Sequence, residues 1–330
     1  MKSLNEGIDQ ISEKLITYLR DDLNNSTIDY DSPLAQLQGG YETYTYRFKL
    51  SGIREELSKP LVLRLYPQFY GTRNAIWEST IQNVLASEGY PVSKVHVTCT
   101  DMSILGGAFF IMEFLPGKLL MNAPLETVPD ILGKTHAALH RIDPTAVIKK
   151  LSEQGIEEDG YRLTSRLDWL NDRAGKLPWI REGVNWLIEN RPPEPEYLAI
   201  CHGDFHALNI LIQDGKVTGV LDWPGFIIAD PVLDVANTIV LTTIPSKHIA
   251  ASMGSYSSVD WEMIVQLYLD AYRTQSPLDS EHLDYYRVRR CVDALIQGFE
   301  GQKVWQHPLI VKDLIEYIHN ITDLEITMTG

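Results

Sequence analysis

The sequence lacks the features that define several classes of protein. It has only three cysteines, which are far apart, odd in number and in no metal-ligand spacing. This excludes a disulfide framework and predicts free thiols in a reducing cytosol. Apolar runs fall well short of the roughly 18 residues that a membrane span requires, and the acidic, amphipathic N-terminus does not read as a signal peptide. We therefore expect a cytoplasmic protein with no membrane partner.

Positive charge is also scarce. The chain has 29 Lys and Arg residues against 44 Asp and Glu residues, a formal net charge of −15. A nucleic-acid-binding protein normally presents a basic face, so we expect no nucleic-acid partner. The balance is compatible with an acidic pocket for a cationic small molecule, whereas an anionic ligand would need local cations or a metal ion.

The sequence does contain enough apolar material for two lobes. At 330 residues, 44% of them hydrophobic, it exceeds the size at which a single core stops growing. Spacings of three and four between apolar residues predict a leading amphipathic helix over about residues 3–23. Apolar runs and alternation predict strands, and helical spacing around 77–85 predicts one inserted helix. The strands are expected at 44–50, 61–65, 95–97 and 109–112.

Beyond Pro116-Gly117, which marks a turn, helical spacing dominates. Helices are expected at 131–142, 167–177, 184–188, 264–272, 285–299 and 311–321. The sequence thus predicts a two-lobed α+β fold. Residues 1–115 form a small antiparallel-sheet lobe with one inserted helix, and residues 116–330 form a larger helical lobe that carries one β-hairpin.

That hairpin lies within residues 199–235, the most informative part of the chain. Two apolar segments, 210–212 and 217–221, flank Asp214-Gly215. This dipeptide tolerates the left-handed backbone of a tight hairpin turn. The two ends of such a hairpin lie next to each other, so polar residues that flank it should meet.

Asn209 precedes the hairpin and Asp222 follows it, so we expect their side chains to lie side by side. An amide oxygen and a carboxylate form a hard oxygen-donor site suited to Mg²⁺. Asp204, in the loop before Asn209, can then act as base for an acceptor hydroxyl, as phosphoryl transfer requires. A single loop Asp is usually solvated or a cap, but three polar residues at the ends of an apolar hairpin favour a catalytic site.

These segments resemble the aminoglycoside phosphotransferase and choline kinase-like small-molecule kinases. The resemblance rests on HGDFHALN at 202–209, VLDW at 220–223, and ADP at 229–231 followed by Asp234. It implies the two-lobed protein-kinase fold and the Mg²⁺-dependent transfer of a phosphate from ATP or GTP to a hydroxyl of a small molecule.

The resemblance also implies roles for single residues. Asp204 corresponds to the catalytic base, and Asn209 and Asp222 correspond to the Mg²⁺ ligands. Asp234 corresponds to a structural brace of the catalytic loop. His206 belongs to the same pattern, without an assigned role.

The N-terminal half contains candidate phosphate-binding residues. Gly39 and Gly40, with Thr43 close behind, lie between two expected strands, where glycine lets the backbone approach phosphates; a plain hairpin turn is the simpler alternative. Arg64 lies in an apolar strand, at the place of the family's lysine that holds the α- and β-phosphates. Glu78 opens the next helix and is the expected ion-pair partner of Arg64. The alternative is that Arg64 lies on the surface of an edge strand and that Glu78 is placed in the first helical turn only because the helix dipole favours an acidic residue there.

Residues 111–117 resemble the hinge of the same kinases. There the backbone groups around Glu113 and Leu115 would hydrogen-bond the adenine edge. Because these contacts use the backbone, the side chains themselves carry little information.

The acceptor is expected between the catalytic loop and the C-terminal helices. Trp223 and Phe226 directly follow the predicted metal ligand, and Asp293 and Glu300 can present carboxylates to an amine. We expect a hydroxylated, cationic acceptor such as an aminoglycoside. Each carboxylate taken alone is more often solvated helix surface, and the aromatic residues suit core packing, a sugar, a quaternary amine or a macrolide.

Two other functions are compatible with the sequence. His136 and His140, four residues apart, together with the H-x-D-x-H pattern at 202–206, offer ligands for a zinc-dependent hydrolase. Helix packing is the commoner role for such histidines, and no third cluster at ligand spacing supports the metal. The second alternative is a catalytically inactive nucleotide-binding scaffold. The complete catalytic set argues against it, while Arg64 and Thr43 depart from the family pattern.

Overall fold

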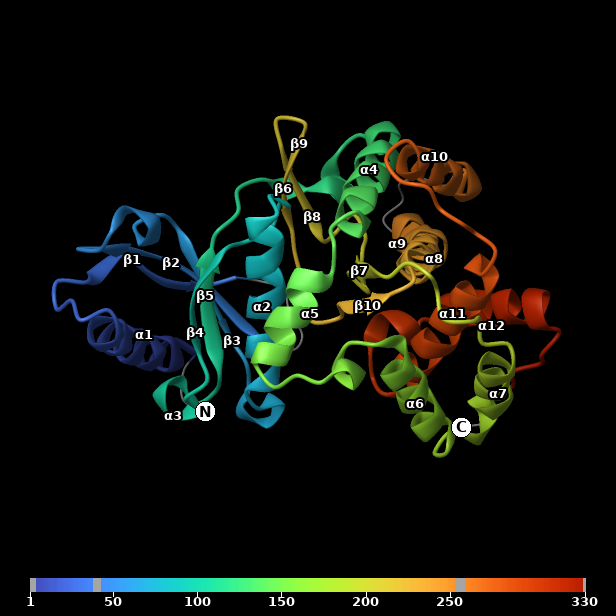
Figure 1. The fold of residues 1–330 in the computed structure, drawn as a ribbon, viewed down its shortest axis with the longest axis horizontal. Coiled ribbons are helices and arrows are strands. Elements are labelled where there is room, and N and C mark those ends of the chain that lie inside the picture. The colour runs from blue at the N-terminus through green and yellow to red at the C-terminus, as the bar shows by residue number, and fades with distance from the viewer. Residues whose placement is uncertain (1–3, 38–42, 253–258, 329–330) are drawn as a thin grey trace. The chain divides into compact units, whose positions relative to one another are not determined.

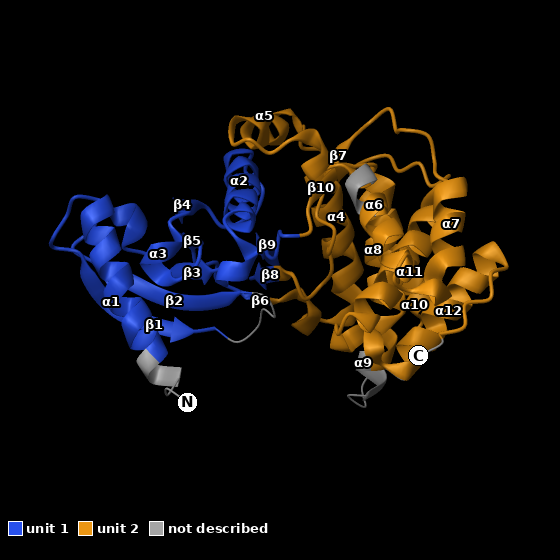
Figure 2. Ribbon diagram, turned by 90° about the horizontal axis from the view of Figure 1, so that it is seen from below, with its two compact units in different colours: residues 1–118, 211–224 blue, residues 119–210, 225–330 orange. Residues whose placement is uncertain are grey.

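The computed structural model describes residues 4–37, 43–252 and 259–328. The chain forms two compact units. The first unit comprises residues 1–118 and 211–224, and the second comprises residues 119–210 and 225–330 (Figure 2). The first is built on a sheet and the second mainly from helices, so the predicted α+β class is confirmed.

The first unit is centred on a five-stranded antiparallel sheet (Figure 1). Its strands, in spatial order, are β1 (Asp29–Gln36), β2 (Tyr44–Ser51), β3 (Leu61–Leu65), β5 (Phe109–Glu113) and β4 (Val95–Cys99). Its helices are α1 (Leu4–Asp22), α2 (Arg73–Ser87) and the short α3 (Met102–Leu105). The expected leading helix is therefore present as α1, and the inserted helix as α2.

The sheet and α1 share a core. Leu15 and Leu19 of α1 are buried in one cluster with Phe48, Leu61 and Phe109 of the sheet. Each of these side chains is at most 1% exposed. This packing explains why an amphipathic helix precedes the sheet, since its apolar stripe covers apolar residues of the strands.

A three-stranded sheet completes this part of the fold. It contains β6 (Lys118–Leu119), β8 (Ile210–Gln213) and β9 (Lys216–Val220) in that order. The turn between β8 and β9 has positive φ at Asp214 (53°) and Gly215 (74°), as the sequence predicted. The Val220 N–H donates to the Pro91 carbonyl (2.7 Å), within the first unit. The hairpin therefore groups with the sheet unit, although the sequence places it in the second part of the chain.

The second unit is mainly helical (Figure 1). Its helices are α4 (Val128–His140), α5 (Thr145–Glu153), α6 (Leu163–Ala174), α7 (Arg181–Glu189), α8 (Pro231–Thr243), α9 (Pro245–Ser252), α10 (Trp261–Arg273), α11 (Leu283–Phe299) and α12 (Pro308–Thr322). Two short strands, β7 (Ala199–Cys201) and β10 (Ile227–Ala229), pair antiparallel among them.

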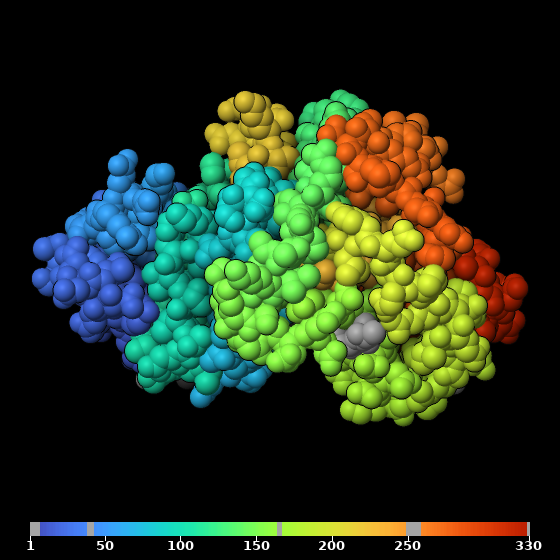
Figure 3. All heavy atoms as spheres, in the orientation of Figure 1, coloured from blue at the N-terminus to red at the C-terminus, as the bar shows by residue number. Residues whose placement is uncertain are grey.

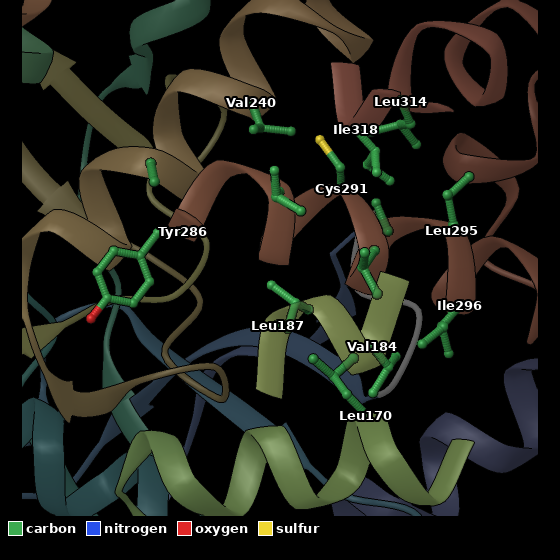
Figure 4. Packing of buried hydrophobic residues seen from close by; sticks show 14 of the residues in the cluster. Leu170, Val184, Leu187, Val240, Tyr286, Cys291, Leu295, Ile296, Leu314 and Ile318 are labelled. Atoms are coloured by element: carbon green, nitrogen blue, oxygen red, sulfur yellow. The ribbon is translucent and has the colours of Figure 1, made fainter. Parts of the chain in front are cut away.

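The core of this unit is formed by side chains from several helices. Figure 4 shows Leu170 and Val184 close to Ile296, and Cys291 close to Ile318. All three cysteines of the chain are free and buried. Among the described residues, no helix has the length and hydrophobicity needed to cross a membrane.

One helix with a central role was not expected from the sequence. Residues 231–241 of α8 are almost all buried, including the polar Asp234, Asn237 and Thr238. A helix buried on all sides has no amphipathic period, so spacing could not reveal it.

Candidate active site

The loop with Asp204 connects β7 to β8 and is anchored by a buried carboxylate. Asp234 on α8 is fully buried. Its Oδ2 accepts the N–H of His202 (2.5 Å), and its Oδ1 accepts the N–H of Gly203 (2.9 Å). Gly203 has φ +83°, and a Cβ added there would lie 2.3 Å from the carbonyl oxygen of Gly225. Only glycine fits this turn without strain.

Other side chains of α8 hold the rest of the loop backbone. Asn237 Nδ2 donates to the Gly203 carbonyl (3.4 Å), and Thr238 Oγ1 donates to the Phe205 carbonyl (2.8 Å). The Phe205 ring is fully buried and stacks on His136, with ring centroids 4.0 Å apart. Residues on both sides of Asp204 are thereby fixed.

Asp204 itself keeps an accessible carboxylate. Its side chain is 43% exposed, and its Oδ2 lies 3.3 Å from Nε2 of His206. Burial of the loop acts to raise the pKa of Asp204, but the hydrogen bond and charge of His206, with smaller contributions from Arg290 and His202, lower it to about 2. The carboxylate is therefore ionised at neutral pH. This contact gives His206 the role that the sequence did not reveal, although the H-x-D-x-H pattern pointed to the residue.

Asn209 is oriented by the same loop. Its backbone N–H donates to the His206 carbonyl (2.9 Å), and its side-chain Nδ2 donates to the Asp204 carbonyl (3.0 Å). The amide nitrogen is thus used inside the loop. Asn209 belongs to the second unit and Asp222 to the first, so the expected side-by-side arrangement of the two stays a prediction.

In the first unit, Asp222 shares an arginine with Glu78. Arg64 Nη2 lies 2.9 Å from Asp222 Oδ1 and 3.3 Å from Glu78 Oε1. Burial acts to lower the pKa of Arg64, but Glu78, Tyr66 and Asp222 outweigh it and raise the pKa. The ion pair expected between Arg64 and Glu78 is present, and Asp222 is a further partner that the sequence did not suggest.

The backbone of Asp222 and the Nε atom of Arg64 both have unusual surroundings. Asp222 adopts φ 68°, a left-handed conformation that is rare outside glycine and tends to occur at functional sites. Its side chain is 47% exposed, whereas that of Arg64 is only 14% exposed. The Nε of Arg64 is buried without a hydrogen-bond partner among the described residues.

The remaining nucleotide-site predictions fall in the first unit. Gly39 and Gly40 lie outside the described residues, while Thr43 is half-buried just before β2. The N–H of Glu113 donates to the Lys94 carbonyl (3.0 Å). Leu115 packs close to Gly219 of β9, where an added Cβ would lie 2.5 Å from its Cδ1.

The predicted acceptor residues are placed in different ways. Trp223 and Phe226 are fully buried, and Trp223 Nε1 donates to the Val220 carbonyl (3.0 Å). Asp293 lies 3.6 Å from Arg290, and its Oδ1 accepts from Gln297 (3.2 Å). The structure pairs Glu300 with Arg173 at 2.6 Å. Both carboxylates are therefore already paired with arginine.

His136 and His140 meet Asp234 in the interior of the second unit. Their ligand-type atoms all lie within 4.8 Å of one another, so the structure supplies the third group that the sequence spacing did not show. The three side chains are at most 1% exposed. A hydrolytic zinc ion needs an open coordination position for water, which a fully buried cluster does not offer.

A cavity of about 220 Å³ also lies in the second unit, beside β10 and the start of α6. Its lining includes Arg162, Arg191, Asp230 and Tyr286 and none of the predicted site residues. The yellow-green chain from residue 167 to residue 198, part of which contributes to this lining, lies on the face shown in Figure 3.

Comparisons with known proteins agree with this architecture. The family described as "Phosphotransferase enzyme family" matches residues 33–273. Human acyl-CoA dehydrogenase family member 11 is 25% identical over 240 residues, which cover 68% of this chain and 29% of that protein. The uncharacterized protein YcbJ of Bacillus subtilis is 32% identical over 126 residues, 33% of this chain and 35% of that protein. The matches thus span about a third or less of the curated relatives.

Solved structures show the same fold. A putative aminoglycoside phosphotransferase from Ralstonia eutropha has a TM-score of 0.65 at 20% identity, covering 93% of this chain and 98% of that one. Aminoglycoside phosphotransferase APH(4)-Ia, in a ternary complex with AMP-PNP and hygromycin B, has a TM-score of 0.62 at 17% identity, covering 94% and 100%. A macrolide 2'-phosphotransferase from Brachybacterium faecium has a TM-score of 0.57 at 16% identity, covering 95% and 99%.

Proposed function

Because this chain belongs to the phosphotransferase enzyme family, we propose that it transfers the γ-phosphate of ATP or GTP to a hydroxyl group of a small molecule. The observation that carries the proposal is the Asp204 carboxylate. It is ionised and 43% exposed, and it is held on a loop whose backbone is fixed by Asp234. A group that orients an alcohol for phosphoryl transfer needs this combination of access and rigid placement.

In the proposed reaction, the acceptor oxygen bonds to the γ-phosphorus as the bond from phosphorus to the β–γ bridging oxygen breaks. The hydroxyl proton passes to Asp204, and the nucleoside diphosphate leaves. With a pKa of about 2, Asp204 is a weak base, so it accepts the proton late, when the attacking oxygen has become strongly acidic. Its main contribution is then to orient the O–H group.

The donor set fits a magnesium ion. The oxygen of Asn209 and the carboxylate of Asp222 are hard ligands, and Mg²⁺ typically takes one or two such groups plus substrate phosphates. When bound, the ion would neutralise charge on the β- and γ-phosphates. Arg64, held by two carboxylates, would donate to the α- and β-phosphates.

The nucleotide is proposed to lie along the first unit. Gly39, Gly40 and Thr43 would approach its phosphates, and the backbone near Glu113 and Leu115 would meet the adenine edge. Since the N–H of Glu113 already donates to Lys94, Leu115 is the better candidate for that contact. The AMP-PNP bound by the related APH(4)-Ia supports a nucleoside triphosphate as donor.

For the acceptor, the first candidate is an aminoglycoside-like amino alcohol. Hygromycin B in the complex of APH(4)-Ia supports this class. Asp293 and Glu300 are the carboxylates that would meet its amines, with Trp223 and Phe226 shaping the site from the core. The composition further supports a cytoplasmic location with neither nucleic acid nor membrane among the partners.

A second acceptor class is favoured by the charges on α11. Arg290 is 5% exposed, contacts the Trp305 ring at 4.6 Å, and contributes to the lowered pKa of Asp204. Because Asp293 and Glu300 already pair with arginine, an anionic group on the acceptor is also compatible with this region. Several curated relatives are named as acyl-CoA dehydrogenases, so a hydroxy acid or hydroxyacyl-CoA is the second candidate acceptor.

The proposal is tested by nucleoside diphosphate release with Mg²⁺. The panel contains ATP or GTP with an aminoglycoside, a macrolide, a hydroxy acid and a hydroxyacyl-CoA. We expect one class to stimulate release above background hydrolysis, and Asp204→Asn to abolish that stimulation. Asp214→Asn makes the same change in the exposed hairpin turn and should leave it intact.

The other outcomes are equally informative. Nucleotide binding without stimulation by any acceptor would favour the inactive scaffold. Hydrolysis that requires bound zinc would favour the hydrolase. An unchanged rate in Asp204→Asn would show that the assigned base is wrong.

A further inference from the structure

Two tyrosines and two histidines form a matched pair of contacts between α4 and α10. His136 Nδ1 lies 2.8 Å from the Tyr268 hydroxyl, and His140 Nδ1 lies 2.7 Å from the Tyr272 hydroxyl. Both residue pairs are spaced by four, so each side chain lies one helical turn from its mate. Gly133 makes this approach possible, because a Cβ there would lie 2.4 Å from the Tyr268 carbonyl oxygen.

The other nitrogen of each ring faces Asp234. Nε2 of His136 lies 2.9 Å and Nε2 of His140 lies 3.3 Å from Asp234 Oδ2. This is the carboxylate that accepts the N–H groups of His202 and Gly203 in the loop with Asp204. A continuous set of hydrogen bonds therefore runs from α10 through α4 to the catalytic loop.

The chemistry of these groups fixes where each proton lies. Burial acts to raise the pKa of Asp234, but its contacts with His136 and His140 hold it well below its usual range. An ionised carboxylate only accepts hydrogen bonds, so both histidines must donate from Nε2. Burial lowers the pKa of His136 to about 4, so this ring is neutral and its Nδ1 is an acceptor.

The ring of His140 has surroundings similar to those of the His136 ring. His140 is 1% exposed, and its ring centroid lies 4.3 Å from that of His136. Its Nδ1 faces the Tyr272 hydroxyl as the Nδ1 of His136 faces the Tyr268 hydroxyl. Burial raises the pKa of Tyr268 and of Tyr272, so both hydroxyls stay protonated and each can donate to the Nδ1 that it faces.

We propose that Tyr268 and Tyr272 are positioning residues whose hydroxyl groups fix His136 and His140 as Nε2–H tautomers and so aim two donors at Asp234. The inference rests on the proposed function for its meaning in catalysis, because the reactive group is Asp204. His136 acts twice, since its ring also stacks on Phe205, the residue after Asp204. A phenol on α10 thereby influences where the catalytic carboxylate lies.

A metal ion is the competing interpretation of the same cluster. It would need the lone pairs of both Nε2 atoms, which places the protons on Nδ1, with the tyrosine oxygens as acceptors. The two interpretations therefore assign opposite tautomers to both histidines, and the tautomer can be measured.

The test uses Tyr268→Phe, Tyr272→Phe and a matched control, Tyr285→Phe. Tyr285 is also buried in the second unit, but its hydroxyl donates to the Leu187 carbonyl (3.0 Å). Three measurements are made on each protein: ¹⁵N chemical shifts of labelled histidine rings, amide hydrogen exchange of residues 202–205, and nucleoside diphosphate release with the best acceptor.

In the wild type we expect Nε2–H tautomers for both rings and no stoichiometric zinc by elemental analysis. Tyr268→Phe and Tyr272→Phe should each shift the Nδ1 resonance of their partner, speed exchange in the catalytic loop, and lower kcat by roughly tenfold. The KM for the nucleotide should change little. Tyr285→Phe should show none of these changes.

Nδ1–H tautomers, or one zinc ion per chain, would overturn the proposal in favour of a metal site. Loop exchange and histidine shifts in Tyr268→Phe that match those of Tyr285→Phe would also overturn it. The ring and exchange measurements need no acceptor, so they stand even if no phosphotransferase activity is found. That result would count against the proposed function alone.

Discussion

The stability of this protein should fall in mild acid because His136 is buried as a neutral ring. Its pKa is lowered from 6.5 to about 4, mainly by burial, with the neighbouring His140 acting in the same direction and Asp234 opposing. The folded state thus binds fewer protons than the unfolded state between these values, so the free energy of unfolding falls as pH falls through this range. At about 1.36 kcal/mol per pH unit, the difference corresponds to about 3.4 kcal/mol in full.

The assay compares urea unfolding at pH 7.5 and pH 4.5 for the wild type, His136→Gln and a matched control. About 2.5 kcal/mol of the contribution of His136 should be lost by pH 4.5. Glutamine keeps an N–H for Asp234 but does not titrate, so the pH-dependent loss should be smaller in His136→Gln by about that amount. His319→Gln makes the same change at an exposed position of α12 and should follow the wild type.

The readout is the difference between the two pH values, so a general destabilisation by the substitution does not affect it. Titratable groups that do not contact residue 136 contribute equally to the wild type and His136→Gln, and their effects cancel. Parallel pH profiles for the wild type and His136→Gln would refute the conclusion that this ring is buried in its neutral form.

Three further predictions concern the loop, the ion pair and the thiols. Gly203→Ala should lower the free energy of unfolding by about 3 kcal/mol or more, through steric clash and backbone strain. Gly71→Ala should lower it by only about 1 kcal/mol, because φ is also positive there but the surrounding space is open. Equal losses for the two variants in urea unfolding would contradict the clash at Gly203. Arg64→Lys keeps the positive charge but not the planar guanidinium group. Titration with nucleotide should therefore show roughly tenfold weaker binding, as for the loss of one charge-assisted hydrogen bond. Arg54→Lys, at an exposed position, should bind the nucleotide normally. Because the three thiols are buried and burial raises the pKa of Cys291 to about 12, a thiol reagent should label the native protein far more slowly than the urea-unfolded protein, and rapid native labelling would disprove this.

Much of the fold was predictable from local patterns. The leading helix expected at about 3–23 is α1 (Leu4–Asp22), and the strand expected at 61–65 is β3 with the same bounds. The left-handed turn at Asp214-Gly215 was read from the dipeptide alone. These features are encoded by residues close together in the sequence, where spacing and turn chemistry act directly.

Other elements gave no local signal. Helix α8 is buried on nearly every side, so it shows no polar face, and the short strands β7 and β10 gain their order from pairing with each other. In the candidate site, too, the sequence indicated some features and left others undecided. The residue types of Asp204, Asn209 and Asp222 indicated phosphoryl transfer, and the roles drawn from the resemblance stay predictions.

The sequence by itself determined which chemical groups the protein has and the local elements that bear them. Tertiary structure alone decided which buried polar groups meet. His136 lies 98 residues from Asp234 and 132 residues from Tyr268 in the chain, yet it bonds both. No local pattern encodes such a meeting. A buried donor needs an acceptor, and packing decides which one is within reach. Here the close approach of α10 to Gly133 of α4 brings the tyrosine hydroxyls to the histidine rings.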